Sequence, residues 1–378
     1  MQPTVETIPL LTLASGDRLS LNVYRYRGAQ PGKRCYVQAN LHGAEIIGNG
    51  LISALMQWLD TIPATQLAGE ICLVPVCNPL ATNQRSHFFA TGRYNPYDGR
   101  DWNRIFWAYD PEPSDLSAFV RSQLTKPPTT IQRQFRRHQR QAFEAAHQGL
   151  STPQSRPWRE HYRYCLQSLS LEADYVVDLH SSSNQGLPYL YCFASRQESG
   201  QLFGFDYGIL MADYGGESFD EAFMEPWLAL EEEFADQGRP LRFDVGAYTL
   251  ELGSSMVMDS PFCEQALQGM INFWAAKGLL TLPDYGVFGH DTQFGDRRRI
   301  EAYYAPRGGF MTGSIALKQR VKKGEKLYEL LQFGESLPNR LAIPAATDGI
   351  IFDLGLNHSV NQGEYVLSLW KTDGDRRQ

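Results

Sequence analysis

A histidine and a glutamate stand three residues apart in the segment NLHGAE, which covers residues 40–45. Imidazole nitrogen and carboxylate oxygen are both ligands of zinc, so His42 and Glu45 could supply two bonds of a metal site. The pattern is short and arises often by chance. It also fits a plain turn from a strand into a helix, with His42 hydrogen-bonded at the strand end. A metal site needs a third ligand elsewhere in the chain.

His180 is the best candidate for that third ligand. It ends the run DYVVDLH, which is apolar and rich in β-formers, so it would reach the carboxyl edge of a sheet beside His42 and Glu45. Hydrolytic zinc sites keep three protein ligands and leave one position for water. Only His87, in a loop, competes for this role, because the other histidines lie in a polar stretch or near the C-terminal region: His138, His147, His161, His290 and His358.

Zinc hydrolases also need a carboxylate base, and the segment TLELGSS contains one in Glu251. A glutamate inside an apolar strand is costly to bury unless it is paired or functional. The alternative is structural. Strand alternation turns Glu251 away from Leu250 and Leu252, so its side chain could simply face solvent.

A loop rich in arginine could bind an acidic substrate. The segment TGRYNPYDGRDWNRIF (residues 91–106) contains Arg93, Arg100 and Arg104 among glycine, proline, asparagine and aspartate. Guanidinium groups bind carboxylates through two parallel hydrogen bonds. Without the metal ligands, the same segment would be taken for an ordinary surface loop.

The elements that must position these residues alternate between strands and helices. Helical spacing of apolar residues covers 46–62, and the strand-like segments are 34–42, 69–79, 173–184, 187–195 and 245–255. Apolar strands separated by helices predict an α/β fold with a mixed, mostly parallel sheet flanked by helices. Ligands of such sheets bind beyond the carboxyl ends of the strands.

Two parts of the chain depart from this alternation. Residues 110–171 are polar and lack strand signals, which predicts a helical insertion in a catalytic domain that covers 1–285. Residues 286–378 change to short β-runs, in which VKKGEKLYEL (321–330) and VNQGEYVLSL (360–369) repeat one pattern. This repeat resembles a biotinyl/lipoyl-type barrel-sandwich, an all-β module. No lysine occurs between Lys326 and Lys371, so a carrier role is excluded.

Composition excludes several functions. The chain of 378 residues carries a net charge of −7 and is 43% hydrophobic, which is typical of a globular protein without a nucleic-acid surface. The basic segment RQFRRHQRQ (133–141) indicates a solvated helix face rather than a polyanion site. No segment predicts a signal peptide or a membrane span. Six scattered cysteines without a CxxC pair favour a reducing, cytoplasmic location.

Taken in order, NLHGAE, the NP at 78–79, Arg93 and Asn103-Arg104, DLH (178–180) and TLELG (249–253) resemble the succinylglutamate desuccinylase/aspartoacylase family, relatives of the zinc carboxypeptidases. The similarity covers residues 35–255, and the β-module resembles that family's appended domain. The resemblance implies one zinc ion per chain, with His42, Glu45 and His180 as its ligands.

The resemblance also implies roles for the remaining residues. Glu251 would be the general base, Arg93 would polarise the scissile carbonyl, and Asn103 and Arg104 would hold the substrate carboxylate. Asp101 would orient His42 through a hydrogen bond. The family commonly has D-L-N-R-x-F-P-G where this chain has DWNRIFWAY (101–109). The metal and base assignments do not depend on these positions, whereas the identity of the substrate does.

The function expected from these features is zinc-dependent removal of an acyl group from an N-acyl amino acid, a small-molecule substrate. A zinc carboxypeptidase acting on peptides or cell-wall fragments would use the same residues. A non-catalytic binding protein with a vestigial site is a second alternative. An interaction scaffold that uses the β-module and the basic segment is a third. Neither nucleic acid nor membrane is an expected partner, and a homo-oligomer is possible.

Overall fold

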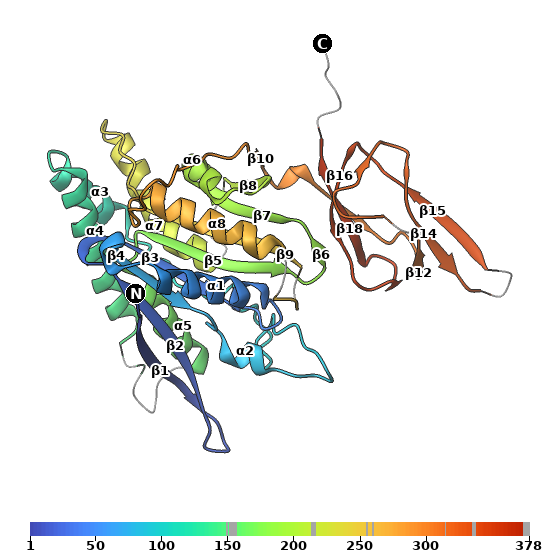
Figure 1. The fold of residues 1–378 in the computed structure, drawn as a ribbon, viewed down its shortest axis with the longest axis horizontal. Helices are drawn as coiled ribbons and strands as arrows, with labels where there is room; N and C mark the ends of the chain where they lie inside the picture. The colour runs from blue at the N-terminus through green and yellow to red at the C-terminus, as the bar shows by residue number, and fades with distance from the viewer. Residues whose placement is uncertain are drawn as a thin grey trace, which may run out of the picture.

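The computed structural model describes residues 1–148, 150, 157–212, 217–254, 256–258, 261–313, 315–334 and 338–372. Its main feature is a nine-stranded sheet in the order β1-β2-β4-β3-β5-β9-β7-β8-β10 (Figure 1). The strands of this sheet are β1 Thr4–Thr12, β2 Arg18–Arg27, β3 Gln30–Ala39, β4 Ala68–Val74, β5 Tyr175–Ser182, β7 Pro188–Phe193, β8 Tyr207–Met211, β9 Gly246–Ser254 and β10 Gln293–Gly295.

The sheet is mixed, with parallel pairs in its centre. Strands β4, β3, β5 and β9 run parallel to one another, and so do β7, β8 and β10. The antiparallel pairs are β1–β2, β2–β4 and β7–β9. The prediction of an α/β fold with a mixed, mostly parallel sheet is therefore confirmed.

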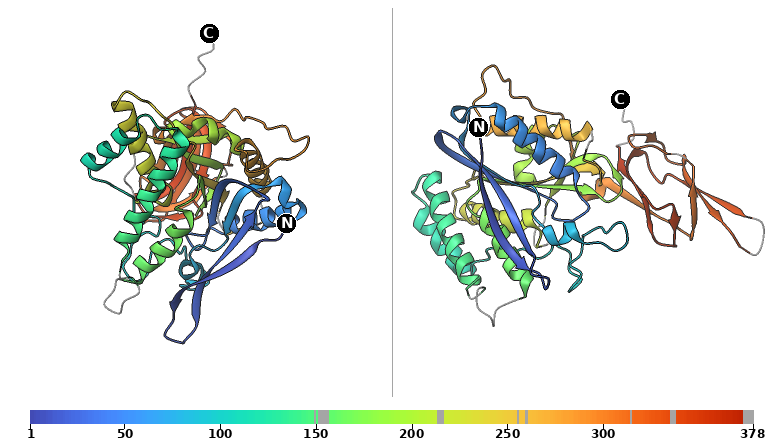
Figure 2. Two further views of the ribbon diagram at one scale, coloured as in Figure 1. Left: turned by 90° about the vertical axis from the view of Figure 1, so that its left-hand side faces the viewer. Right: turned by 60° about the horizontal axis from the view of Figure 1, so that its bottom comes forward.

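Helices cover both faces of the sheet (Figures 1 and 2). One apolar core lies beneath α1 and α8, and another lies beneath α3, α4, α5 and α7. None of the helices within the described ranges is long and apolar enough to cross a bilayer. The helices are α1 Ile47–Thr61, α2 Pro79–Asn83, α3 Pro113–Gln123, α4 Pro128–Ala146, α5 Trp158–Ser170, α6 Gln197–Gly200, α7 Phe219–Asp236 and α8 Pro261–Ala276.

Strand alternation decides which side chains of β5 and β9 can reach the site. On β5, Val177 and Leu179 point into the core under α1 and α8, while Val176 points to the opposite face. Successive side chains alternate between faces, so Asp178 and His180 share the face of Val176. On β9, the same rule puts Glu251 on this face, because Leu250 points into the α1–α8 core. The polar residues of both strands therefore face the same side.

The predicted helical stretch at 110–171 contains α3, α4 and α5 in its described part. Apolar side chains of these helices, such as Val120, Phe135 and Tyr162, are buried in the core that they share with the sheet and α7. The stretch thus forms much of one helical layer.

The C-terminal residues form two antiparallel sheets at one end of the molecule (Figures 1 and 2). The repeated segments fold alike, since a short strand leads through a turn into a long strand in each. Gly324 and Gly363 occupy these turns with φ of 89° and 85°, where a side chain would strain the backbone. The strands are β11 Ile300–Tyr304, β12 Gly309–Thr312, β13 Arg320–Val321, β14 Lys326–Gln332, β15 Asn339–Pro344, β16 Gly349–Leu354, β17 Ser359–Val360 and β18 Tyr365–Lys371.

The N-terminal part and the C-terminal module each contribute one strand to a sheet of the other. β10 follows β9 and α8 in sequence and completes the nine-stranded sheet beside β8. In the other direction, β6 (Gln185–Gly186) leaves the end of β5 and pairs with β16 of the C-terminal module. An apolar cluster lies across the same boundary: Leu187, Tyr207, Ile209, Ile350, Phe352 and Trp370.

Candidate active site

The turn after β3 brings His42 and Glu45 together. The strand ends at Ala39, and Asn40 adopts a left-handed conformation with φ of 68°. Its side-chain amide donates to the carbonyl oxygens of His42 (3.1 Å) and Gly43 (3.0 Å), which closes the turn. A Cβ atom at Gly43 would lie 2.1 Å from the Ala81 oxygen, so only glycine fits there.

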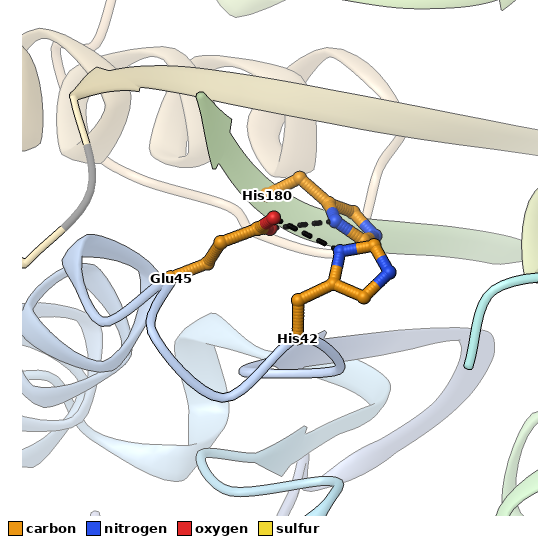
Figure 3. Close-up of side chains that lie close together, drawn as sticks. All are labelled: His42, Glu45 and His180. Carbon is orange, nitrogen blue, oxygen red and sulfur yellow. Dashed lines mark hydrogen bonds and ion pairs between the residues drawn. The ribbon is translucent and has the colours of Figure 1, made fainter. Parts of the chain in front are cut away.

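Three potential ligand atoms converge at this edge of the sheet (Figure 3). The Glu45 carboxylate lies between two imidazoles, with Oε1 2.9 Å from His42 Nδ1 and Oε2 2.8 Å from His180 Nδ1. One ligand atom from each residue lies within 4.8 Å of the other two, and all three residues are buried. The structure therefore brings together the three residues that the sequence analysis selected as zinc ligands.

The outward nitrogen of each imidazole has a carboxylate partner. His42 Nε2 lies 3.1 Å from Asp101 Oδ1, and His180 Nε2 lies 3.0 Å from Asp178 Oδ2. A carboxylate that accepts the Nε2 proton fixes the tautomer in which Nδ1 is free to bind a metal. Both rings thus present Nδ1 to the site, as metal ligands would.

The electrostatics of the cluster also suit a cation. Burial opposes ionisation of Glu45, but the two imidazoles outweigh this effect and hold its pKa well below the ordinary value. Burial disfavours charge on His180 as well, yet Asp178 and Glu45 together raise its pKa. The pKa of Asp101 is lowered to about 2 despite its burial, because His42 and the Asn103 amide donate to its carboxylate. The ionised carboxylates of Glu45 and Asp101 therefore lie beside the rings.

Zinc fits this donor set. Two imidazole nitrogens and one carboxylate oxygen are the ligands of a common class of hydrolytic zinc sites, and both imidazoles have the carboxylate partners that such ligands usually have. His42, Glu45 and His180 would hold the ion.

Asp178 was not assigned a role from the sequence. It lies two residues before His180 on the same face of β5, so the DLH segment carried the signal through strand alternation. It is completely buried, and its Oδ1 accepts a hydrogen bond of 2.9 Å from Gln38 Nε2. Gln38 therefore holds Asp178 in the orientation that supports His180.

We expect Asp178→Asn to weaken zinc binding about 10- to 100-fold, because the amide cannot reproduce both interactions of the carboxylate. The dissociation constant can be measured by competition with a chromogenic chelator. Asp206→Asn is a matched control, since Asp206 pairs with His290 at 3.2 Å outside the cluster. Equal zinc affinities of the Asp178 variant and the parent would contradict the role of Asp178.

Glu251 lies beside the cluster on the neighbouring strand. It lies directly opposite His180 where β9 pairs with β5. Its half-buried side chain lines a cavity that His42, Glu45 and His180 also line. Burial raises the pKa of Glu251 to about 7, and the negative charge of Glu45 adds to this effect. A carboxyl group with such a pKa can accept and release a proton near neutral pH.

The arginine loop also reaches the cavity. Arg93 Nε lies 3.0 Å from Asp101 Oδ2, so one carboxylate contacts both this guanidinium and the His42 ring. Asn103 Oδ1 accepts a hydrogen bond of 2.9 Å from the Phe219 amide, which leaves its NH₂ group to donate elsewhere. The exposed Arg104 donates to the Asn103 carbonyl oxygen at 2.6 Å.

These residues surround a cavity of about 500 Å³. The residues to which the resemblance assigns roles all line it except Asp101, which contacts His42. Arg100, the other arginine of the predicted substrate loop, is not part of the lining either. The cavity has further walls that the sequence analysis did not identify, including residues of the C-terminal module: Arg297, Ile300, Ala302, Phe352, Asp353, Tyr365 and Ser368.

Comparison with known proteins shows to which family the chain belongs. The model of the succinylglutamate desuccinylase/aspartoacylase catalytic domain matches residues 31–276, well over half of the sequence. The chain belongs to this family. The predicted resemblance is therefore confirmed, and with it the expectation that the chain belongs among hydrolase-like enzymes.

Solved structures share the fold of this chain. A succinylglutamate desuccinylase/aspartoacylase family protein from Shewanella amazonensis SB2B superposes with a TM-score of 0.85 at 28% identity, covering 97% of this chain and 98% of that one. A second, from Shewanella frigidimarina NCIMB 400, has a TM-score of 0.87 at 24% identity, covering 98% of both chains. A third, from Rhodobacter sphaeroides, has a TM-score of 0.65 at 17% identity, covering 99% and 96%. Among curated proteins, no sequence matches.

The departures from the usual succinylglutamate desuccinylase/aspartoacylase pattern in DWNRIFWAY have a structural reason. Trp102 is fully buried, and its ring packs edge-on against Trp158 and Tyr162 of α5. Trp107 packs against Phe143 of α4, and its backbone exchanges two hydrogen bonds with the Gln167 side chain. The two tryptophans thus pack the segment that carries Asn103 and Arg104 against the helices of the 110–171 stretch.

Proposed function

We propose that this chain is a zinc-dependent amide hydrolase that removes the acyl group from an N-acyl amino acid. The observation that carries the proposal is the placement of Glu251 beside His180 on adjacent strands, with both facing the cavity that His42 and Glu45 also line. A metal site alone would suit a binding protein. A proton-accepting carboxylate next to it suits hydrolysis.

Zinc at this site supplies Lewis-acid chemistry, which activates water and polarises a carbonyl group. Glu251 takes a proton from the attacking water as the new carbon–oxygen bond forms. It then passes that proton to the leaving nitrogen as the amide bond breaks, so the products are a carboxylate and an amino acid. The pKa of about 7 suits a group that must perform both transfers.

Arg93 stabilises the negative charge that develops on the carbonyl oxygen. Its Nε is held by Asp101, which leaves its terminal nitrogens to donate into the cavity. A preorganised donor of this kind typically contributes about 3–4 kcal/mol to the transition state. Because Asp101 also contacts His42, the same carboxylate fixes the carbonyl-binding group and a metal ligand.

Asn103 and Arg104 hold the carboxylate of the amino-acid portion. The Asn103 oxygen is committed to the Phe219 amide, so its NH₂ group is the part that can bind an acceptor. Arg104 adds a guanidinium group on the same side of the cavity. Two donors side by side favour a carboxylate over a neutral group.

The proposal is tested by loading the protein with zinc, counting metal per chain, and assaying a panel of N-acetyl amino acids for amine release beside a panel of peptides. We expect about one zinc ion per chain and hydrolysis of N-acetyl amino acids. Release of C-terminal residues from peptides alone would favour a carboxypeptidase instead. Absence of metal binding and of turnover would favour a binding protein.

The pKa of Glu251 predicts an acid limb in the pH profile. A general base works only when ionised, and a raised pKa keeps this carboxyl protonated to higher pH, so activity is lost as pH falls. Bound zinc favours the ionised form, so we expect kcat/KM to be half-maximal at or below about pH 7 and to fall about tenfold per pH unit beneath it. Metal content measured across the same range separates this limb from loss of zinc.

A further inference from the structure

The C-terminal module contributes a carboxylate to the wall of the catalytic cavity. Asp353 on β16 pairs with Ser368 on β18, which in turn pairs with Ala302 on β11, and all three line the cavity. Asp353 is also paired with Gly186 of the short strand β6, which leaves the end of β5. The module is thus in direct contact with the segment that follows His180.

Three side chains donate hydrogen bonds to Asp353. Ser182 Oγ lies 2.6 Å from its Oδ2, while Asn184 Nδ2 (3.0 Å) and Tyr365 Oη (2.7 Å) approach its Oδ1. Ser182 Oγ additionally accepts a hydrogen bond of 3.1 Å from the Asn184 amide. The donors come from both parts of the chain, and all of them line the cavity.

These hydrogen bonds determine which donors and acceptors around Asp353 remain available to a ligand. An ionised carboxylate only accepts hydrogen bonds, so the hydroxyl hydrogens of Ser182 and Tyr365 are both directed at Asp353. The groups that these residues leave for a ligand are mainly acceptors, a lone pair of Tyr365 Oη and the side-chain oxygen of Asn184, because the one donor left among them is the second N–H of Asn184. Together with the charge of Asp353, they favour a ligand group that donates hydrogen bonds and disfavour a carboxylate.

The cluster lies on the opposite side of the catalytic centre from Asn103 and Arg104. Asn103 is tied to the start of α7, where Asp220 accepts from Thr249, two residues before Glu251 on β9. Asp353 is tied to Ser182, two residues after His180 on β5. Because His180 and Glu251 are side by side, the two anchors lie on either side of them along the strands.

Arg297, the arginine that the module brings to the cavity wall, lies at a different place. Its guanidinium is 5.5 Å from the centroid of the Tyr191 ring on β7. Tyr191 pairs with Thr249 on β9, whereas Ser182 pairs with Ser254, five residues further along the same strand. Five residues of strand span roughly 16 Å, so Arg297 is on the side of Asn103 rather than of Asp353.

We propose that Asp353 and Tyr365 are specificity-determining residues that select an acyl tail ending in an N–H donor, a carboxamide or an ammonium group, over one ending in a carboxylate. The proposal rests on the deacylase function above, in which Asn103 and Arg104 hold the amino-acid carboxylate. The acyl group then extends the other way, past Ser182. Two residues of β5 separate Ser182 from His180, roughly 7 Å, which a short acyl chain can span.

The test uses three acyl groups of equal chain length on the amino acid that the zinc-loaded enzyme releases fastest from its N-acetyl form. These are succinyl, succinamoyl and 4-aminobutanoyl, which end in a carboxylate, a carboxamide and an ammonium group. We expect kcat/KM for the carboxamide and ammonium tails to exceed that for succinyl by at least about 10-fold, since the succinyl carboxylate would face the like charge of Asp353.

Asp353→Asn should reduce this preference to within about threefold, because the variant removes the charge and frees a donor for the succinyl carboxylate. Glu329→Gln is the matched control: Glu329 pairs with Lys326 and Arg340 in the other sheet of the module, away from the cavity. Its preference should equal that of the parent. Tyr365→Phe, which keeps the ring but removes the acceptor, should also reduce the preference and remains informative if Asp353→Asn does not fold.

Three outcomes would overturn the inference. A preference of the parent for the succinyl tail would show that the wall binds carboxylates. An equal loss of kcat/KM on all three substrates in the Asp353 and Tyr365 variants would show a purely structural role. Failure of every derivative, the N-acetyl form included, would overturn the deacylase function itself, so the two proposals fail in distinguishable ways.

Discussion

Glu251→Gln is expected to bind zinc as tightly as the parent and to lose at least about 10²-fold in kcat/KM, because general-base catalysis typically contributes that much or more. Glutamine keeps the size of the side chain but cannot accept the proton of the attacking water. Since Glu251 is separate from the three ligand residues, the metal should remain. Elemental analysis gives zinc per chain, and steady-state kinetics on the best N-acetyl amino acid give the rate.

Glu232→Gln is a suitable control for this variant, since Glu232 is an exposed residue of α7 and should be neutral on exchange. The acid limb of the pH profile provides a second check. If Glu251 is the titrating base, the residual activity of its glutamine variant should no longer fall with pH in the way the parent's does. Unchanged turnover would exclude Glu251 as the base.

His180→Ala is expected to reduce zinc binding more than Glu251→Gln does. Removing one of three ligands should lower zinc affinity by more than the about 10- to 100-fold expected of a residue that only orients a ligand, and should leave activity below about 1% of the parent. It also leaves Asp178 buried without the imidazole at 3.0 Å. Zinc content after dialysis and the dissociation constant by chelator competition measure this loss.

His290→Ala serves as the matched histidine control. His290 pairs with Asp206 as His180 does with Asp178, but it lies outside the cluster. Its zinc content should equal that of the parent. Full zinc occupancy of the His180 variant would remove His180 from the ligand set, and the circular dichroism spectrum of each variant separates loss of metal from loss of fold.

The part of the site that could be predicted from the sequence is the part with a local signal. His42, Glu45 and His180 stand at or just past the ends of apolar strands, and Glu251 interrupts one. Parallel neighbouring strands end at the same edge, so the placement of the four residues follows from the α/β pattern. The order of the strands in the sheet does not follow from this pattern. The apolar segment 187–195 also gives no indication that β7 runs antiparallel to β9.

The remainder of the site depends on contacts between distant segments. Asp353 bonds to Ser182 across 171 residues, and no periodicity or motif of β16 indicates that it faces a cavity. Gln38 supports Asp178 across 140 residues in the same way. Such pairs are set by how strands and modules pack, which a single sequence records only through burial patterns. The resemblance to the family assigned the groups that are expected to react and one that positions them, Asp101, but neither Asp178 nor Gln38.

The strands β6 and β10, which pair across the boundary between the two parts, limit where this chain can be truncated or recombined with a relative. A chain that stopped at residue 285 would leave β8 without its partner β10, and would uncover Leu187, Tyr207 and Ile209. An open strand edge beside an apolar surface recruits other chains. The module would likewise lose β6 from the edge of β16. Recombination between relatives at this boundary would therefore yield a working enzyme only when both partners of each strand pair are exchanged together.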